Sequence, residues 1–147
     1  MAATVEEDIF RGLMEYFGRW TLPAGWTAAA NIANPGIAFT PSASKPFVSL
    51  EIHFNRSIET DLSLEMDPIR QGFMRANVMW PKGQGHVQGL GVAASIRKHF
   101  QRGTTALNDG TQTRIDQDPE IGVIVTGDTH VTIPVTIRWI CYPKVPA

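Results

Sequence analysis

The sequence is short of the features that define several functional classes. Of its 147 residues only Cys141 is a cysteine, so no disulfide can form within the chain. Charged residues make up 18% of the chain and the formal net charge is -1, without the strong positive field of a duplex-DNA binder. No apolar run approaches the roughly 18 residues of a membrane-spanning helix. We therefore expect neither a membrane nor duplex DNA as a direct binding partner.

The first residues are acidic. Glu6, Glu7 and Asp8 precede any apolar stretch, which is the wrong charge for the start of a secretion signal. We therefore expect the protein to be made and kept in the cytosol, or assembled there into a larger structure.

Apolar side chains are plentiful enough for one core. Hydrophobic residues make up 43% of the chain, and a chain of this length buries roughly 68–70% of its unfolded surface. The sequence contains no repeat, linker or low-complexity tract, so we expect a single domain over residues 1–147. The low share of charge suggests that partners cover part of the surface.

The spacing of apolar residues predicts two helices. From the N-cap Thr4, apolar residues recur at helical spacing as far as Trp20, before Pro23 and Gly25 end the helix. A second helix is predicted from 86 to 101, after a glycine-rich turn. Its expected buried residues are Gly89, Val92, Ala93, Ile96 and Phe100.

Alternating apolar and polar residues predict strands at 48–54, 57–66, 71–80, 112–116, 120–126 and 129–142. Asn55 and Arg56 leave room only for a tight reversal, which predicts an antiparallel hairpin between the first two strands. Pro134 cannot donate to a ladder, so its part of the last strand is expected at an edge or a bulge. The expected fold class is α+β: a mixed, mainly antiparallel sheet, two helices packed on one face and a projecting β-hairpin.

The connection over residues 21–45 is long and rich in turn-forming residues. We expect a short extended piece at Ile37 and Phe39. Connections of this length in compact domains are usually functional. The loop and the hairpin therefore supply candidate partner-contact residues, namely Asn34, Phe39, Ile58 and Leu62.

The strongest motif for ligand chemistry is the turn Gly83-Gln84-Gly85 before a helix, because helix starts of this kind bind phosphate. Its spacing departs from the dinucleotide fingerprint, and no lysine follows as in a P-loop. The glycines already serve to turn the chain from strand to helix. We therefore predict no cofactor-binding residue here.

No other group meets the demands of catalysis or metal binding. A trio of Ser95, His99 and Asp109 lacks the strained turn that exposes a nucleophilic serine. The lone thiol of Cys141 lies in an alternating apolar run, where it packs as a small apolar side chain. The histidines show no metal-ligand spacing: His53, His86, His99 and His130. We therefore predict no catalytic or metal-binding residues and no enzyme activity.

Acidic residues alternate along the predicted strand 57–66. Glu59, Asp61 and Glu65 share one face by strand spacing, and Asp67 continues the series. A solvated strand edge explains such a series, while a metal site and the lining of an acidic pore remain alternatives.

Glycine, proline and aromatic landmarks occur in an order that resembles one family. They are Asn34-Pro35-Gly36, Lys45-Pro46-Phe47-Val48, Arg70-Gln71-Gly72-Phe73, the stretch 78–85 ending in Gly83-Gln84-Gly85, Phe100-Gln101-Arg102-Gly103 and the closing strand 131–142. In this order they resemble the tail terminator proteins of long-tailed phages and their prophage relatives.

The resemblance implies a homo-oligomeric ring, usually a hexamer, that caps the finished tail tube, ends its polymerisation and offers a surface for head joining. It implies three partners: other copies of the chain, the tail-tube protein and a head connector or stopper protein. DNA would only pass through the lumen, and an acidic lining of Glu59, Asp61 and Glu65 would give its phosphates no binding site.

The family has no catalytic residues to transfer and no cofactor. The implied location is the head-proximal end of the virion tail, after assembly in the host cytoplasm. The alternatives are another head-tail connector or tail-tube component, and a small nucleotide-binding module or enzyme.

Overall fold

The computed structural model describes residues 4–57 and 69–142. In chain order its helices are α1 (Val5–Gly18), α2 (Ala28–Asn31) and α3 (Val87–His99). Its strands are β1 (Ile32–Ala33), β2 (Phe47–Phe54), β3 (Arg70–Pro81), β4 (Thr105–Asn108), β5 (Thr111–Ile115), β6 (Glu120–Ile121), β7 (Val125–Thr126) and β8 (His130–Cys141).

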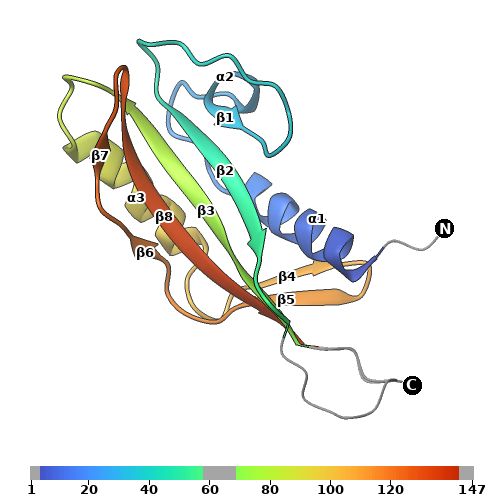
Figure 1. Ribbon diagram of the computed structural model, residues 1–147. Helices are drawn as coiled ribbons and strands as arrows, with labels where there is room; N and C mark the ends of the chain where they lie inside the picture. The colour runs from blue at the N-terminus through green and yellow to red at the C-terminus, as the bar shows by residue number, and fades with distance from the viewer. Residues whose placement is uncertain (1–3, 58–68, 143–147) are drawn as a thin grey trace, which may run out of the picture.

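One curled, mostly antiparallel sheet organises the fold (Figure 1). Its order is β1-β2-β3-β8-β5-β4, and β6 and β7 also pair with β8. The pair β1–β2 is parallel and the other described pairs are antiparallel. The predicted α+β class with a mixed, mainly antiparallel sheet is therefore confirmed.

Helix α1 begins where the sequence predicts. The Thr4 hydroxyl accepts a hydrogen bond from the backbone N–H of Glu7 at 3.2 Å, which satisfies one of the unpaired donors of the first turn. The helix ends at Gly18, and Trp20 lies just beyond it as a buried residue. Its apolar stripe, Ile9, Leu13 and Phe17, is buried.

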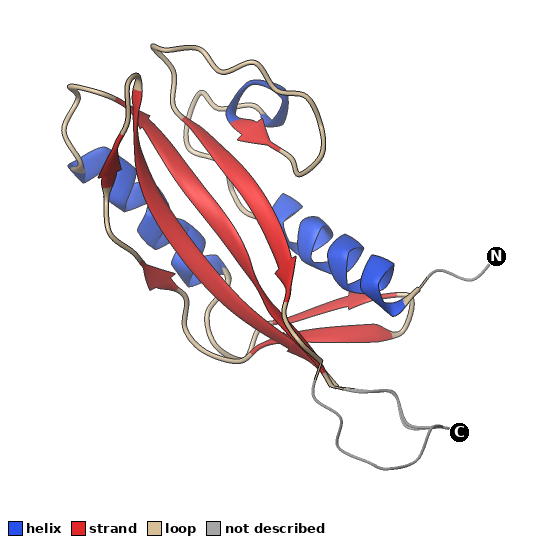
Figure 2. Ribbon diagram, viewed as in Figure 1, coloured by secondary structure: helices blue, strands red, loops and turns tan. Residues whose placement is uncertain are grey.

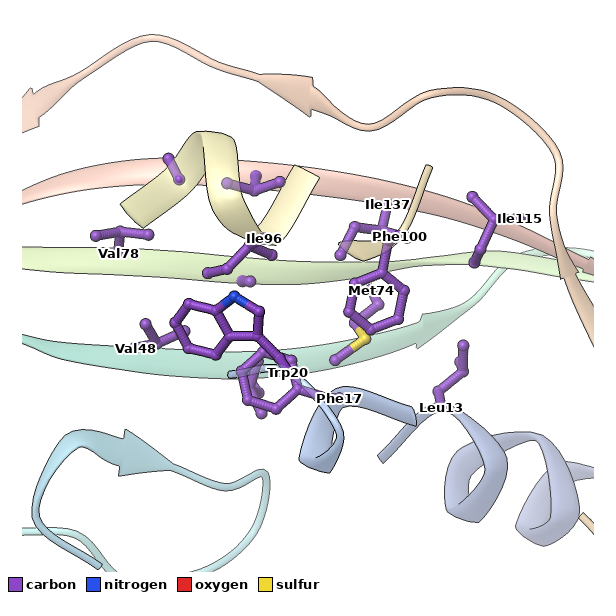
Figure 3. Packing of buried hydrophobic residues seen from close by; sticks show 14 of the residues in the cluster. Leu13, Phe17, Trp20, Val48, Met74, Val78, Ile96, Phe100, Ile115 and Ile137 are labelled. Atoms are coloured by element: carbon purple, nitrogen blue, oxygen red, sulfur yellow. The ribbon is translucent and has the colours of Figure 1, made fainter. Parts of the chain in front are cut away.

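The core contains the buried side chains of α1, α3 and the long strands (Figure 3). Alternate residues of β3 and β8 face it, because successive side chains of a strand point to opposite faces. All five residues predicted to be buried in this region are buried, four of them in α3 and the fifth, Phe100, at its C-cap. Gly89 fits this packing closely, since a Cβ there would lie 2.7 Å from the terminal methyl carbon of Ile133, which would have to shift.

The helices differ in the strands they contact. Helix α1 lies mainly against β4 and β5, whereas α3 lies mainly against β3 and β8. Hydrogen bonds join the two helices directly: Tyr16 Oη donates to the carbonyl of His99 at 2.8 Å, and Trp20 Nε1 donates to Ser95 Oγ at 3.0 Å. The Tyr16 and His99 rings also stack at 4.3 Å. These contacts fix the end of α1 against α3.

Strand β2 pairs with a strand that the sequence did not indicate. Its antiparallel partner over all eight residues is β3, from Phe47 opposite Met79 to Phe54 opposite Gly72. The backbone N–H of Asn55 continues this pairing by donating to the carbonyl of Gln71. The predicted projecting strand 57–66, apart from Ser57, lies outside the described residues.

The connection over residues 21–45 contains structure that the sequence pattern did not predict. Thr27 caps the short helix α2, and β1 follows it directly. The expected extended piece at Ile37 and Phe39 is wrong, since the strand of this segment is β1. A strand of two residues is too short to show an alternation of apolar and polar residues. Strand β4, with four residues, was not predicted for the same reason.

Pro134 lies inside the sheet, opposite Asn77 of β3. Its carbonyl accepts a hydrogen bond from Gly122 on the other side, just where β6 ends and before β7 begins. The missing donor of the proline therefore falls at an interruption in the neighbouring strand. The prediction of a bulge describes this position, and the alternative of a sheet edge does not.

Candidate interaction surfaces

The loop between β1 and β2 is fixed at both ends. The side chain of Asn31, which is buried, accepts from the backbone of Thr27 at 2.9 Å and donates to the carbonyl of Pro46 at 2.8 Å. At the far end, a ring nitrogen of the buried His130 lies 2.9 Å from the carbonyl of Lys45. The loop is therefore held as a defined surface.

The two predicted contact residues of this loop, Asn34 and Phe39, also lie against other parts of the same chain. The Phe39 ring packs on Phe47 at 5.1 Å, and Asn34 lines a small cleft beneath the end of α1. The large apolar side chain that the loop presents to solvent is Ile37, which is 67% exposed. Ile37 was missed as a contact residue, although an apolar residue directly after Asn34-Pro35-Gly36 was a visible signal. Ile58 and Leu62 lie outside the described residues.

No described helix covers the second face of β2, β3 and β8 (Figure 2). Near the end of β2 the ring of His53 stacks on Phe73 at 4.6 Å, and the Arg75 guanidinium lies 5.0 Å from the same ring. Glu51 lies 3.6 Å from His53. This face carries both charges and aromatic rings, a composition suited to protein contact.

Several large apolar side chains are exposed at the margins of the fold. Two belong to the outer surface of α3 and two to the segment around β6 and β7, namely Val87, Leu90, Val123 and Val125. Three more lie at strand β4 and at the ends of β2 and β8: Leu107, Phe54 and Tyr142. Exposed apolar groups that lie together, such as Val87 and Leu90 on α3, indicate contact surfaces, whereas a single exposed residue such as Leu107 is ordinary.

The residues weighed for ligand chemistry have structural roles. Gly83 and Gly85 adopt φ of 90° and 77°, a conformation that favours glycine, so they serve the turn into α3. His99 bonds the carbonyl of Tyr16 at 2.7 Å, and Cys141 is buried. Over residues 4–57 and 69–142, no three side chains of the metal-binding types lie close enough to hold an ion.

An ion pair links the start of α1 to the sheet. Arg70 Nε donates to a carboxylate oxygen of Glu6 at 3.0 Å. A backbone N–H and the Arg70 side chain both hydrogen-bond the carboxylate, which lowers the pKa of Glu6 below its usual 4.5. The pair holds α1 over the first residue of β3.

Among the described segments, no helix is long and apolar enough to cross a membrane. The acidic series Glu59, Asp61 and Glu65 lies outside them.

A small α+β fold with an uncovered sheet face and exposed apolar side chains offers surfaces for contact with other proteins. The comparison with known families is specific: residues 8–139 match the family described as phage tail terminator protein, and the chain therefore belongs to this family. The family places the protein among structural components of the phage tail. A solved structure is similar in fold, with a TM-score of 0.71. It is 21% identical and aligns over 93% of this chain and 97% of its own. A search of curated proteins gives no match.

Proposed function

We propose that this protein caps the phage tail tube, ends its polymerisation and provides the surface to which the head joins. The observation that carries the proposal is the family match, which extends over residues 8–139. The apolar margins and the uncovered sheet face support it, because a capping protein works through surfaces and needs no reactive group. On this proposal the protein is not an enzyme and has no cofactor.

The working form is a ring of identical copies, six in number, in which each chain is a single domain over residues 1–147. Repeated head-to-tail contacts between identical copies close into a ring when the rotation fits. One side of the ring meets the tail-tube protein, and the other meets a head connector or stopper protein. The ring lies at the head-proximal end of the virion tail and is assembled in the host cytoplasm.

The loop between β1 and β2 and the segment after β2 supply the contacts to the tube. The proposed contact residues are Asn34, Phe39, Ile58 and Leu62. We add Ile37 because its apolar side chain is exposed to solvent. Replacing Ile37 by glutamate is expected to weaken binding to tube ends while leaving the melting temperature unchanged, because its side chain faces solvent.

The lumen is lined by Glu59, Asp61 and Glu65, so that the passing genome finds like charge and does not adhere. Replacing all three by lysine is expected to leave tube capping intact and to slow DNA passage. Genome delivery at the rate of the unchanged protein would remove this assignment and leave the capping role untouched.

The direct test of the capping role is to locate the protein on tubes. Tubes assembled from the tail-tube protein are mixed with gold-labelled chain and imaged in negative stain. We expect label at one end of each tube and none along its length. Label along the tube wall, or filaments formed by the chain alone, would favour a tube component instead.

A further inference from the structure

Helix α3 is apolar on both sides. It buries Gly89, Val92, Ala93 and Ile96 in the core, yet its outer surface also carries Val87, 85% exposed, and Leu90, 37% exposed. Gly91 and Ala94 continue this outer line, and no atom lies within 4 Å of the point where a Cβ of Gly91 would be. Positions i, i+3, i+4 and i+7 form one stripe, the pattern of a helix that docks into a groove. We call Val87, Leu90, Gly91 and Ala94 the α3 ridge.

A groove of matching chemistry lies between α1 and the end of β2. Phe10 and Phe54 form its apolar wall, and Glu6, Glu7 and Arg11 form its rim. Its volume is about 280 Å³ and it is wide open, which is small and shallow for a small-molecule pocket. Phe54 is 45% exposed. We call these five residues the α1 groove; its size suits one or two apolar side chains of a partner.

The two surfaces lie on different sides of the molecule. In Figure 1 the start of α3 is to the left of the long strands, and α1 is to their right. Because the ridge and the groove lie on different sides, a single two-fold contact between two copies does not bring both ridges into both grooves. They can meet between successive copies in a head-to-tail contact, which is the contact that builds a ring.

The charges of the two helices are complementary. Helix α3 contains no acidic residue and carries Arg97 and Lys98 in its last turn. The exposed charges of α1 are Glu6, Glu7, Arg11 and Glu15, an excess of acid. Opposite charges around an apolar centre set the orientation of a contact and exclude other partners. This complementarity within one sequence points to a second copy of the chain as the occupant of the groove.

We infer that the α3 ridge of one copy inserts into the α1 groove of the next copy, with Val87 and Leu90 beside Phe10 and Phe54. Lys98 of the first copy then lies near Glu7 of the second. The inference deepens the proposed function, on which it rests, by assigning the two halves of the contact that closes the ring.

The test uses one variant for each half. Leu90→Glu breaks the ridge and Phe10→Glu breaks the groove, while Leu107→Glu on β4, outside both surfaces, is the matched control. Light scattering should show rings for the unchanged chain and the control, and monomers for each of the other two variants. The dissociation constant between copies should rise by about 30-fold or more for each.

Mixing the two variants tests whether the ridge and the groove bind each other and not some other surface. Each variant keeps one intact half, so an equal mixture of Leu90→Glu and Phe10→Glu should form 1:1 dimers and nothing larger. The charge reversals Lys98→Glu and Glu7→Lys, both at exposed positions, give a second test that does not depend on folding of a Phe10 variant. Each alone should weaken the ring, and together they should restore it.

The contrary outcomes are distinct. Rings formed by Leu90→Glu, no dimers in the mixture, or a monomeric unchanged chain would each overturn the inference. Loss of tube-end binding by Leu90→Glu with its ring intact would identify the tube protein as the occupant and also overturn it. If the variants change ring formation as predicted but the rings never bind tube ends, the proposed capping role is contradicted. The inferred contact between the α3 ridge and the α1 groove is then still supported.

Discussion

At the scale of single residues, Gly72 of β3 is the glycine with the closest surroundings among those of the described residues. A Cβ at this position would collide with the carbonyl oxygen of His53 and lie 2.6 Å from the Trp139 ring. Both neighbours are fixed, one by the β2 backbone and the other by burial in the core. Glycine is therefore required here by space alone.

Replacing Gly72 by alanine should lower the free energy of unfolding by about 1–3 kcal/mol, because the added methyl group overpacks a filled site. Gly18→Ala at the end of α1 is the control, since a Cβ there meets nothing within 4 Å. It should be neutral or slightly stabilising. Urea unfolding measures both, and equal stability of the two variants would contradict the packing described around Gly72.

The ion pair between Glu6 and Arg70 makes a second prediction at this scale, which concerns pH. The folded pKa of Glu6 is lowered below 4.5, so its contribution is fully present above the unfolded pKa and is lost as the pH falls through the folded value. The Glu6 side chain is 52% exposed, so the contribution is about 0.2–1 kcal/mol.

Urea midpoints measured from neutral pH to below 4.5 should therefore fall less steeply for Glu6→Gln than for the unchanged chain. Glu15→Gln removes a carboxylate whose partner Arg19 lies one turn away in sequence, and serves as the control. The same pH dependence in Glu6→Gln and in the unchanged chain would show that Arg70 does not hold Glu6.

At the scale of elements, a buried carboxylate joins α1 to the β4–β5 pair. Asp8 is only 4% exposed, and its two oxygens accept from Thr111 Oγ1 at 3.0 Å and from Asn108 Nδ2 at 3.2 Å. These bonds span about a hundred residues of sequence and fix the position at which the hairpin lies under the helix.

Asp8→Ala should cost about 1–3 kcal/mol of unfolding free energy, because it leaves the buried hydroxyl of Thr111 without its acceptor. Thr111→Val should cost less in the Asp8→Ala background than in the unchanged chain, since the two groups share one interaction. A double-mutant cycle by thermal unfolding measures this coupling. Additive losses would mean that the hydrogen bond does not join α1 to β5.

The elements themselves were predictable to the extent that they are long. The two long helices and strands β3 and β8 have 12 or more residues each, which is enough for their periodicity to show. Strands β1 and β4 are too short for that. The pairing of β2 with β3 could not be predicted, because alternation tells which face of a strand is buried and carries no information about its neighbour.

The surfaces were less predictable than the core. The α3 ridge was visible in principle, since Val87 and Leu90 lie outside the set predicted to be buried. The α1 groove was not, because Phe10 and Phe54 are 44 positions apart and meet only through the fold. The loop residue Phe39 was assigned to partner contact because it lies in the long connection over residues 21–45, and in the structure its ring packs on Phe47.

At the scale of the whole molecule, the fold gives one small chain several separate surfaces for contact. The sheet and two helices form one core, and this leaves an uncovered sheet face, a ridge, a groove and a fixed loop for contact. Assignment of the chain to the phage tail terminator family gives these surfaces a common purpose. The central claim is that the protein stops the growth of a tail tube.

The length distribution of tubes tests that claim most directly. Tail-tube protein is allowed to polymerise with increasing amounts of the chain, and tube lengths are measured in negative stain. We predict that growth stops when the chain is added, at lengths that shorten as its proportion rises, with the Leu107→Glu variant behaving in the same way. Tubes that keep lengthening at the uninhibited rate, with the folded chain present in excess, would contradict the account.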